Sequence, residues 1–306
     1  MKKILDFIIL LLIISVFGFL LYEKKDTIKF ITSKIFKTNP NPELIDNEYV
    51  KNINYEFVNQ YKNYEITNKD NIKNAIYTYL DHGWDKYTMM CENKYKECQT
   101  DVKIIANDNN YLTSISNFTH PYNTFTKFNT SIGSNGIIIF EKIKRYSKEE
   151  IDETNKMVDK IYNENYDESK NVRDNIKIFH DYIINHTKYD TKYKKDEINY
   201  NSTSSTAYGT LKNGVAICTG YTEAMQLFLE KLNVKNYRIS SNTHEWNLVF
   251  VEGKWLHLDL TWDDPLVSDG SDTITDKYFL IDTNTLSSFN DGEHDFDKDI
   301  YKEANY

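Results

Sequence analysis

The start of the chain is far more apolar than the rest. A predominantly apolar run extends from Phe7 to Tyr22 and follows Lys2 and Lys3. Extended back to Ile4, it predicts a helix of about 28 Å, which matches one hydrocarbon core. We therefore expect a single transmembrane helix within residues 1–22, crossing the membrane through residues 4–22.

This segment fits an uncleaved signal-anchor better than a cleaved signal peptide. The nearest small-x-small cleavage site would be Val16-Phe17-Gly18, which is a poor match. Basic residues lie on both sides of the run, so they do not settle its orientation. The cleaved signal peptide stays open as the alternative.

The middle of the chain alternates between helical and extended patterns. Residues 23–47 contain two of the 4 prolines and predict a stem and linker. Residues 48–146 form a mixed companion region, with helical spacing over Asn71–Gly83 and strand patterns over Asp101–Asp108 and Asn135–Tyr146. A final domain over residues 147–306 begins with a capping box at Ser147 and Glu150, which predicts a helix to about Asn163. A second helical pattern covers Glu168–Thr187.

The last third combines one amphipathic helix with a β-hairpin. Residues 214–232 place apolar side chains at helical spacing, and Cys218 and Tyr221 extend that stripe to its N-terminal end. Residues 236–241, 244–251 and 255–262 have strand patterns, with a turn at Glu252-Gly253. Helices next to an antiparallel hairpin predict the α+β class for this domain.

Composition narrows the possible partners and compartment. The chain of 306 residues has a net charge of −9 and no basic stripe, which argues against nucleic acid as a partner. Cys91 and Cys98 lie in a polar segment where a hairpin would bring them together, so an exported chain would pair them as a disulfide. Two unpaired thiols are the alternative. The chain has 3 cysteines, so this pairing leaves Cys218 unpaired.

The position of Cys218 favours a reactive thiol. At a helix N-terminus, free N–H groups and the macrodipole stabilise a thiolate, whose pKa then falls below the usual ~8.5. The simpler alternative is a small buried hydrophobic residue, because free cysteines are often found in cores.

The hairpin supplies a base and a carboxylate. With the turn at Glu252-Gly253, Val251 faces Lys254 and Leu248 faces His257, so His244 and Asp259 become diagonal neighbours on one face, roughly 7–8 Å apart at the backbone. A slip of one residue would separate them. A structural His–Asp pair would have the same pattern, and His257 on the same face is the alternative base. His180 and His186 lie on the earlier predicted helix as surface or packing residues, and His82, His120 and His294 have no evident partner in the sequence.

Three segments resemble the transglutaminase-like superfamily, whose members are thiol enzymes of papain-like design. They are Phe179–Asp190, Ala207–Leu232 and Thr243–Pro265, with Cys218, His244 and Asp259 in the family's chain order. The resemblance implies a papain-like core of helices on an antiparallel sheet, with Cys218 as nucleophile, His244 as base and Asp259 as its orienting residue. The region from about Asn71 to Tyr146 resembles a companion domain found with bacterial members.

The resemblance also implies a chemistry. A thioester would form on Cys218 with release of an amine, and water or a second amine would resolve it. The Cys218 backbone N–H and a second donor would hold the oxyanion. The candidates for that donor are Tyr208, Ser205 and Thr206. Trp246 and Trp262 are candidates for the cleft wall, with core packing as the alternative favoured for at least one of them.

We therefore expect a membrane-tethered cysteine enzyme with its domains on the extracytoplasmic side of the cell membrane. Its substrate would be a protein or peptide, with cell-wall peptide as one option. No cofactor or metal is expected, because the acidic run from Asp263 to Asp276 lacks calcium-loop spacing. The alternative from another class is a non-catalytic binding module on the same fold.

Overall fold

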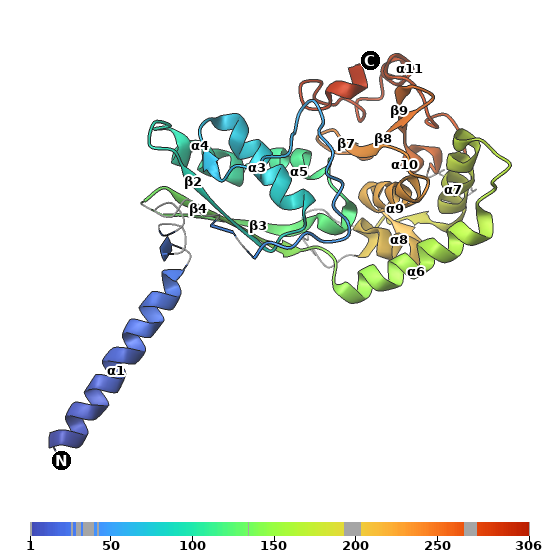
Figure 1. The fold of residues 1–306 in the computed structure, drawn as a ribbon. Coiled ribbons are helices and arrows are strands. Elements are labelled where there is room, and N and C mark those ends of the chain that lie inside the picture. Colours follow the sequence, from blue (N-terminus) through green and yellow to red (C-terminus); the bar gives the residue numbers. More distant parts are fainter. Residues whose placement is uncertain are drawn as a thin grey trace.

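The computed structural model describes residues 2–25, 27–28, 32, 40–41, 43–133, 135–192, 203–265 and 274–305. Its architecture is mixed α+β, as the hydrophobic pattern predicted. The described residues form a four-stranded, a three-stranded and a short two-stranded sheet, and helices lie beside the two larger sheets (Figure 1).

The chain begins with helix α1, Lys2–Glu23. Side chains are described from residue 12 onward, and residues 12–25 are exposed. Among the residues whose side chains are described, no helix has both the length and the apolar character that a membrane span requires. The first half of the expected span, up to residue 11, lies outside those residues.

The N-terminal half contains a four-stranded sheet in the order β1-β2-β4-β3. β2 pairs antiparallel with β4, and β3 pairs antiparallel with β4, whereas β1 pairs parallel with β2. The strands and the helices associated with them are β1 (Glu65–Ile66), α3 (Lys69–Asp81), β2 (Lys86–Cys91), α4 (Cys98–Asn107), α5 (Asn109–Ser116), β3 (Phe125–Ile132) and β4 (Ile137–Lys144).

The expectation of a strand over Asp101–Asp108 is wrong, because this segment lies in helix α4. The reason is the spacing of the residues that the helix buries. Cys98, Val102 and Ile105 lie four and three positions apart on one face of the helix and are buried, whereas Ile104 is 56% exposed. The apolar pair Ile104-Ile105 therefore does not belong to an alternating strand pattern.

Cys91 and Cys98 form a disulfide, which confirms the predicted pairing. The bond joins the last residue of β2 to the first residue of α4, so it ties the sheet to the helix that follows it. Both cysteines belong to the hydrophobic core that includes Phe118 and Phe140, and Cys218 is the free cysteine.

The C-terminal half surrounds a three-stranded antiparallel sheet in the order β7-β8-β9, against which α9 packs (Figure 1). A capping box at Ser147 and Glu150 starts α6, as predicted. The elements are α6 (Lys148–Asn165), α7 (Val172–His186), β5 (Lys188–Tyr189), α8 (Ala207–Asn213), β6 (Val215–Ala216), α9 (Cys218–Lys231), β7 (Asn236–Ser240), β8 (Glu245–Val251), β9 (Lys254–Leu258), α10 (Leu260–Asp263) and α11 (Thr283–Ser288).

The β8–β9 hairpin has the predicted register. Val251 faces Lys254 and Leu248 faces His257. Glu252 and Gly253 have φ of 56° and 79°, as the two central residues of a type I′ turn require. The expected third strand is too long, however, because the chain leaves the sheet at Asp259 and enters α10.

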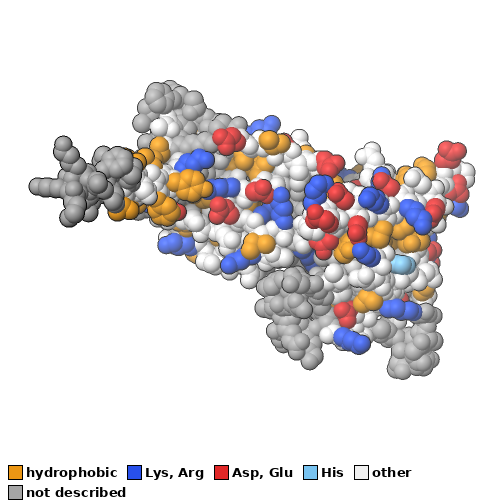
Figure 2. Space-filling model, turned by 90° about the horizontal axis from the view of Figure 1, so that it is seen from below, with side chains coloured by type: hydrophobic (Ala, Val, Ile, Leu, Met, Phe, Trp, Pro, Cys, Tyr) orange, Lys and Arg blue, Asp and Glu red, His pale blue; other side chains and the backbone are white. Residues whose placement is uncertain are grey.

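The two halves share one of the molecule's hydrophobic cores. This core includes Phe118 and Phe140 from the N-terminal half together with Tyr237 and Trp246 from the C-terminal half. A second core lies mainly in the C-terminal half, where it includes Phe179 and Phe228, and it also takes in Tyr122 from the N-terminal half. On the face seen in Figure 2, basic and acidic side chains are interspersed over the described surface.

Candidate active site

Cys218 is the first residue of helix α9. The residue before it, Ile217, occupies the N-cap position and has no polar side chain that could cap the first turn. Backbone N–H groups and the positive end of the helix dipole therefore act at Cys218, as the sequence predicted. The thiol is partly exposed, whereas the rest of the helix from Gly220 to Leu229 is buried.

Close packing holds this helix start in place. A Cβ at Gly220 would lie 2.4 Å from the Ser204 carbonyl oxygen, so no larger residue fits there. The Ile217 N–H donates to that same carbonyl, at 2.9 Å. The backbone just before Cys218 is thereby fixed against residues 203–205.

His244 precedes β8, and its ring lies against Asp259. Its Nε2 is 2.5 Å from Oδ2 of Asp259, and both side chains are buried. The predicted contact is thus present, and it depends on the hairpin register described above. Because Asp259 engages Nε2, Nδ1 is the nitrogen left to exchange a proton with a thiol, and the Cys218 sulfur is near enough to help raise the pKa of His244.

These contacts favour a charged His244. Burial opposes that charge, but the Asp259 carboxylate and the Cys218 sulfur outweigh it and hold the pKa of His244 well above its usual range. Burial likewise opposes ionisation of Asp259, but His244 and His294 hold the pKa of Asp259 well below its usual range. The arrangement places a charged imidazole between the Cys218 sulfur and an ionised carboxylate.

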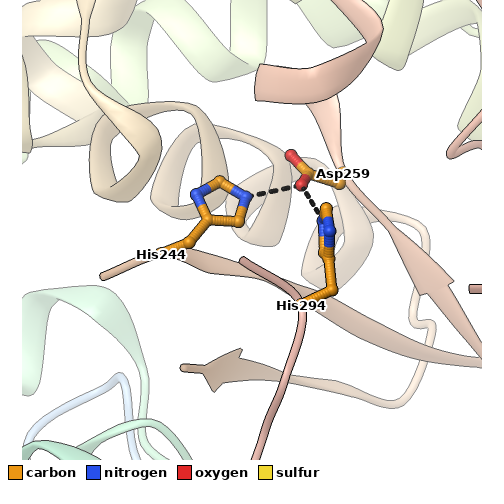
Figure 3. A group of neighbouring side chains, drawn as sticks. All are labelled: His244, Asp259 and His294. Atoms are coloured by element: carbon orange, nitrogen blue, oxygen red, sulfur yellow. Dashed lines mark hydrogen bonds and ion pairs between the residues drawn. The ribbon is translucent and has the colours of Figure 1, made fainter. Parts of the chain in front are cut away.

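Sequence reasoning missed a second histidine at this site. The Nε2 of His294 lies 2.8 Å from the same Oδ2 of Asp259, and its Nδ1 lies 2.8 Å from Oδ2 of Asp291. In Figure 3 the rings of His244 and His294 approach Asp259 from different directions. His294 belongs to an irregular segment after α11, which has no periodicity that would have located it.

His257, the alternative base, is engaged elsewhere. Its Nδ1 accepts a hydrogen bond from Trp246 Nε1 at 2.9 Å, so the ring proton lies on Nε2, 2.9 Å from the Thr283 hydroxyl. Burial, reinforced by His294, lowers the pKa of His257 to about 3. A neutral ring held between Trp246 and Thr283 has a structural role.

Of the three candidate oxyanion donors, Ser205 and Thr206 lead into helix α8 and Tyr208 is its second residue. The Tyr208 hydroxyl donates to Glu153 Oε2 on α6 at 3.1 Å. Thr206 is the N-cap of α8, with its hydroxyl donating to the Thr203 carbonyl. Ser205 offers its carbonyl oxygen to the Arg145 guanidinium.

Both candidate cleft residues contact the site histidines. Trp246 is fully buried, and its ring stacks on His244 with centroids 5.6 Å apart. Trp262 is partly buried and lies edge-on to His244, with centroids 6.5 Å apart. Trp246 therefore packs behind His244, and Trp262 has the exposure that a cleft residue needs.

Tyr189 is a further neighbour of Cys218 that the sequence did not single out. It lies in β5, where it pairs in parallel with Ala216, two residues before Cys218. Burial and then the charge of Cys218 raise the pKa of Tyr189 to about 12. Its hydroxyl is therefore a neutral donor in the electrostatic field of the thiol.

The groups His244–Asp259–His294 and His180–Asp181–Asp276 have the composition of a metal site among the described residues. In the first, the nitrogens lie 2.5 and 2.8 Å from one oxygen. Ligand atoms around tetrahedral zinc lie about 3.4 Å apart, given bonds of about 2.0–2.2 Å, so the distances fit hydrogen bonds better.

The described aspartates of the acidic run from Asp263 to Asp276 each have a different partner. Asp263 pairs with His180, Asp264 accepts from the Tyr221 hydroxyl, and Asp276 pairs with Lys177. Asp269 and Asp272 lie outside the described residues.

No protein-family model matches the sequence, and no curated protein gives a significant match. Among solved structures, the fold is distantly similar to the crystal structure of a TGase, with 18% identity and a TM-score of 0.34. That match covers 50% of this chain and 48% of the other. A candidate cysteine protease from Cytophaga hutchinsonii matches with 12% identity and a TM-score of 0.28, covering 49% of this chain and 65% of the other.

Proposed function

We propose that the chain is a thiol-dependent acyl-transfer enzyme that acts on amides, with Cys218, His244 and Asp259 as its catalytic machinery. The proposal rests on the arrangement of Cys218, His244 and Asp259 as three adjacent groups. A thiol at a helix start acts electrostatically on an imidazole, whose Nε2 lies 2.5 Å from a buried carboxylate. A nucleophile needs such a base, and the base needs such an orienting partner.

The chemistry follows from these positions. The Cys218 thiolate attacks the carboxamide carbonyl, and the oxyanion is held by the backbone N–H of Cys218 and a second donor. The C–N bond then breaks as the His244 imidazolium gives its proton to the leaving amine, which leaves a thioester on Cys218. His244, now neutral, deprotonates a water molecule or an incoming amine, which releases the acyl group as an acid or a new amide.

The proposal includes a place of action. We propose that residues 4–22 tether the chain to the cell membrane and that the domains act on the extracytoplasmic side, on protein or cell-wall peptide. Exposed apolar side chains along the described part of α1 support the tether. The Cys91–Cys98 disulfide supports an oxidising compartment, where such bonds form and persist.

The test uses the full chain in detergent and the fact that Cys218 is its free thiol. Peptide amides are assayed for ammonia or amine release, and a fluorescent primary amine is offered as acyl acceptor. We expect Cys218→Ser to lower turnover by roughly 10³-fold or more. Iodoacetamide labelling of the wild type, compared with His244→Ala, reports the ion pair without any substrate.

Two results would decide against an enzyme. They are a Cys218 that alkylates no faster than free cysteine at pH 6, and a rate that His244→Ala leaves unchanged. The alternative, a binding module on the same fold, would then be favoured.

A further inference from the structure

The His294 ring lies between two carboxylates. Nε2 faces Asp259 and Nδ1 faces Asp291, each at 2.8 Å. An ionised carboxylate only accepts hydrogen bonds, so both ring nitrogens must donate. This geometry fits an imidazolium that carries a proton on each nitrogen.

The loop that carries His294 is built to hold it. The Oδ1 of Asp291 accepts hydrogen bonds from the backbone N–H groups of Glu293 and His294, both at 3.1 Å. The Tyr278 hydroxyl donates to the Oδ2 of Asp291 at 3.2 Å. The carboxylate that orients His294 is therefore itself fixed by three donors.

Aromatic rings surround His294. Tyr278 stacks on it, with centroids 5.0 Å apart and an interplanar angle of 20°, and Trp246 and Trp262 lie edge-on at 4.9 and 5.2 Å. The residue is 7% exposed. A cation is stabilised over the face of an aromatic ring, so the stacked Tyr278 ring suits a charged histidine.

Resting on the proposed acyl-transfer function, we propose that His294, held by Asp291, is a positioning residue for the His244–Asp259 pair. Its N–H group donates to the Asp259 carboxylate and fixes its orientation, and its positive charge weakens the attraction between that carboxylate and His244. If Asp259 interacted with His244 alone, the pKa of His244 would be higher. With His294 present, His244 releases its proton to the leaving amine more easily.

The charged groups around His294 determine in which direction the pKa of His244 should shift when His294 is replaced. The titratable groups that face it are the carboxylates of Asp259 and Asp291, the rings of His244 and His257, and the Tyr278 hydroxyl. His257 is neutral, so the charges that matter are two carboxylates and two imidazoliums. Removing the charge of His294 leaves Asp259 to act on His244 alone.

The experiment compares His294→Gln with the wild type in the full chain. Glutamine keeps an N–H donor for Asp259 but carries no charge. We expect the deprotonation midpoint of His244, followed by ¹⁵N NMR, to rise by about one pH unit. Asp291→Asn, which removes the counter-charge of His294, should shift the midpoint in the same direction, and the double variant should add little.

A matched control separates charge from stability. His120 is also buried and lies 3.1 Å from a carboxylate, Glu230, but outside this site. We expect His120→Gln to leave the His244 midpoint unchanged. Amide turnover should fall about tenfold in His294→Gln, measured on samples whose circular dichroism matches the wild type.

Two results would overturn the proposal. The first is a His244 midpoint that stays within 0.2 units, about the error of such a titration, in folded His294→Gln protein. The second, which needs no variant, is a wild-type His294 ring at pH 7 with only one protonated nitrogen. Both are read without substrate, so they remain decisive even if no amide is turned over.

Discussion

At the scale of single residues, Asp259 has two separate tasks. Its Oδ1 accepts from the backbone N–H groups of Thr261 and Trp262, at 2.9 and 3.3 Å, and so starts helix α10. Its Oδ2 accepts from His244 and His294. An asparagine has one acceptor oxygen, so it can serve the helix or the histidines but not both.

We therefore expect Asp259→Asn to lower the free energy of unfolding by about 3 kcal/mol at pH 7, because a buried imidazolium loses its partner. The pKa of Asp259 is depressed in the folded chain, so its contribution is present above the unfolded value near 4 and is lost as the pH falls through the folded value. Urea unfolding of both proteins from pH 7 to pH 3 measures this. If the difference in unfolding free energy between the wild type and Asp259→Asn grew as the pH fell, the role given to the ionised Asp259 carboxylate would be wrong.

The sequence predicted the contact between His244 and Asp259 but not the contact between His294 and Asp259. His244 and Asp259 flank a hairpin whose two-residue turn sets the register, so strand alternation alone brings them together. His294 lies 35 residues from Asp259 in a segment without regular structure. Its position depends on how the chain returns after α11, and no local pattern encodes that path.

At the scale of elements, prediction succeeded where spacing and capping agreed. The capping box correctly predicted the start of α6, and the Glu252-Gly253 turn correctly predicted the hairpin. It failed at α4, where two adjacent isoleucines look like part of a strand although only one of them is buried. Short apolar runs do not distinguish the two periods, and tertiary packing decides between them.

The β2–α4 connection leads to a stability prediction. Replacing both Cys91 and Cys98 by serine should lower the free energy of unfolding by about 2 kcal/mol, the value for a short closed loop. Urea unfolding with and without reductant measures the loss in the wild type.

Cys218→Ser is the matched control for this prediction, because it removes a thiol but leaves the disulfide intact. It should keep the full response to reductant. A double serine variant that is as stable as the wild type would show that the bond contributes nothing to the fold.

At the scale of the whole molecule, the two halves are joined by buried polar groups as well as by the shared core. The Arg238 side chain on β7 is 2% exposed and donates to the Ser116 carbonyl at 2.7 Å. Arg145, which follows β4, lies 3.1 Å from the buried Glu223 of α9 and also reaches the Ser205 carbonyl. The N-terminal sheet thus supports the helix that carries Cys218.

This arrangement predicts that the two halves unfold together. Hydrogen exchange measured by mass spectrometry across a urea series should show α3 and α9 losing protection at the same urea concentration. Arg145→Met, which leaves Glu223 buried without this partner, should move both midpoints down together. Loss of protection in α3 while α9 stays protected would mean that the halves are independent.

The position of His294 late in the chain also has a consequence for biosynthesis. A ribosome makes Cys218 first, then His244 and Asp259, and His294 only after a further 35 residues. Until that segment emerges, Asp259 has one histidine and no second donor on its Oδ2. The nascent chain therefore contains its thiol before it contains all the charged groups of the site, and the contact between Asp259 and His294 cannot form until the segment with His294 has emerged.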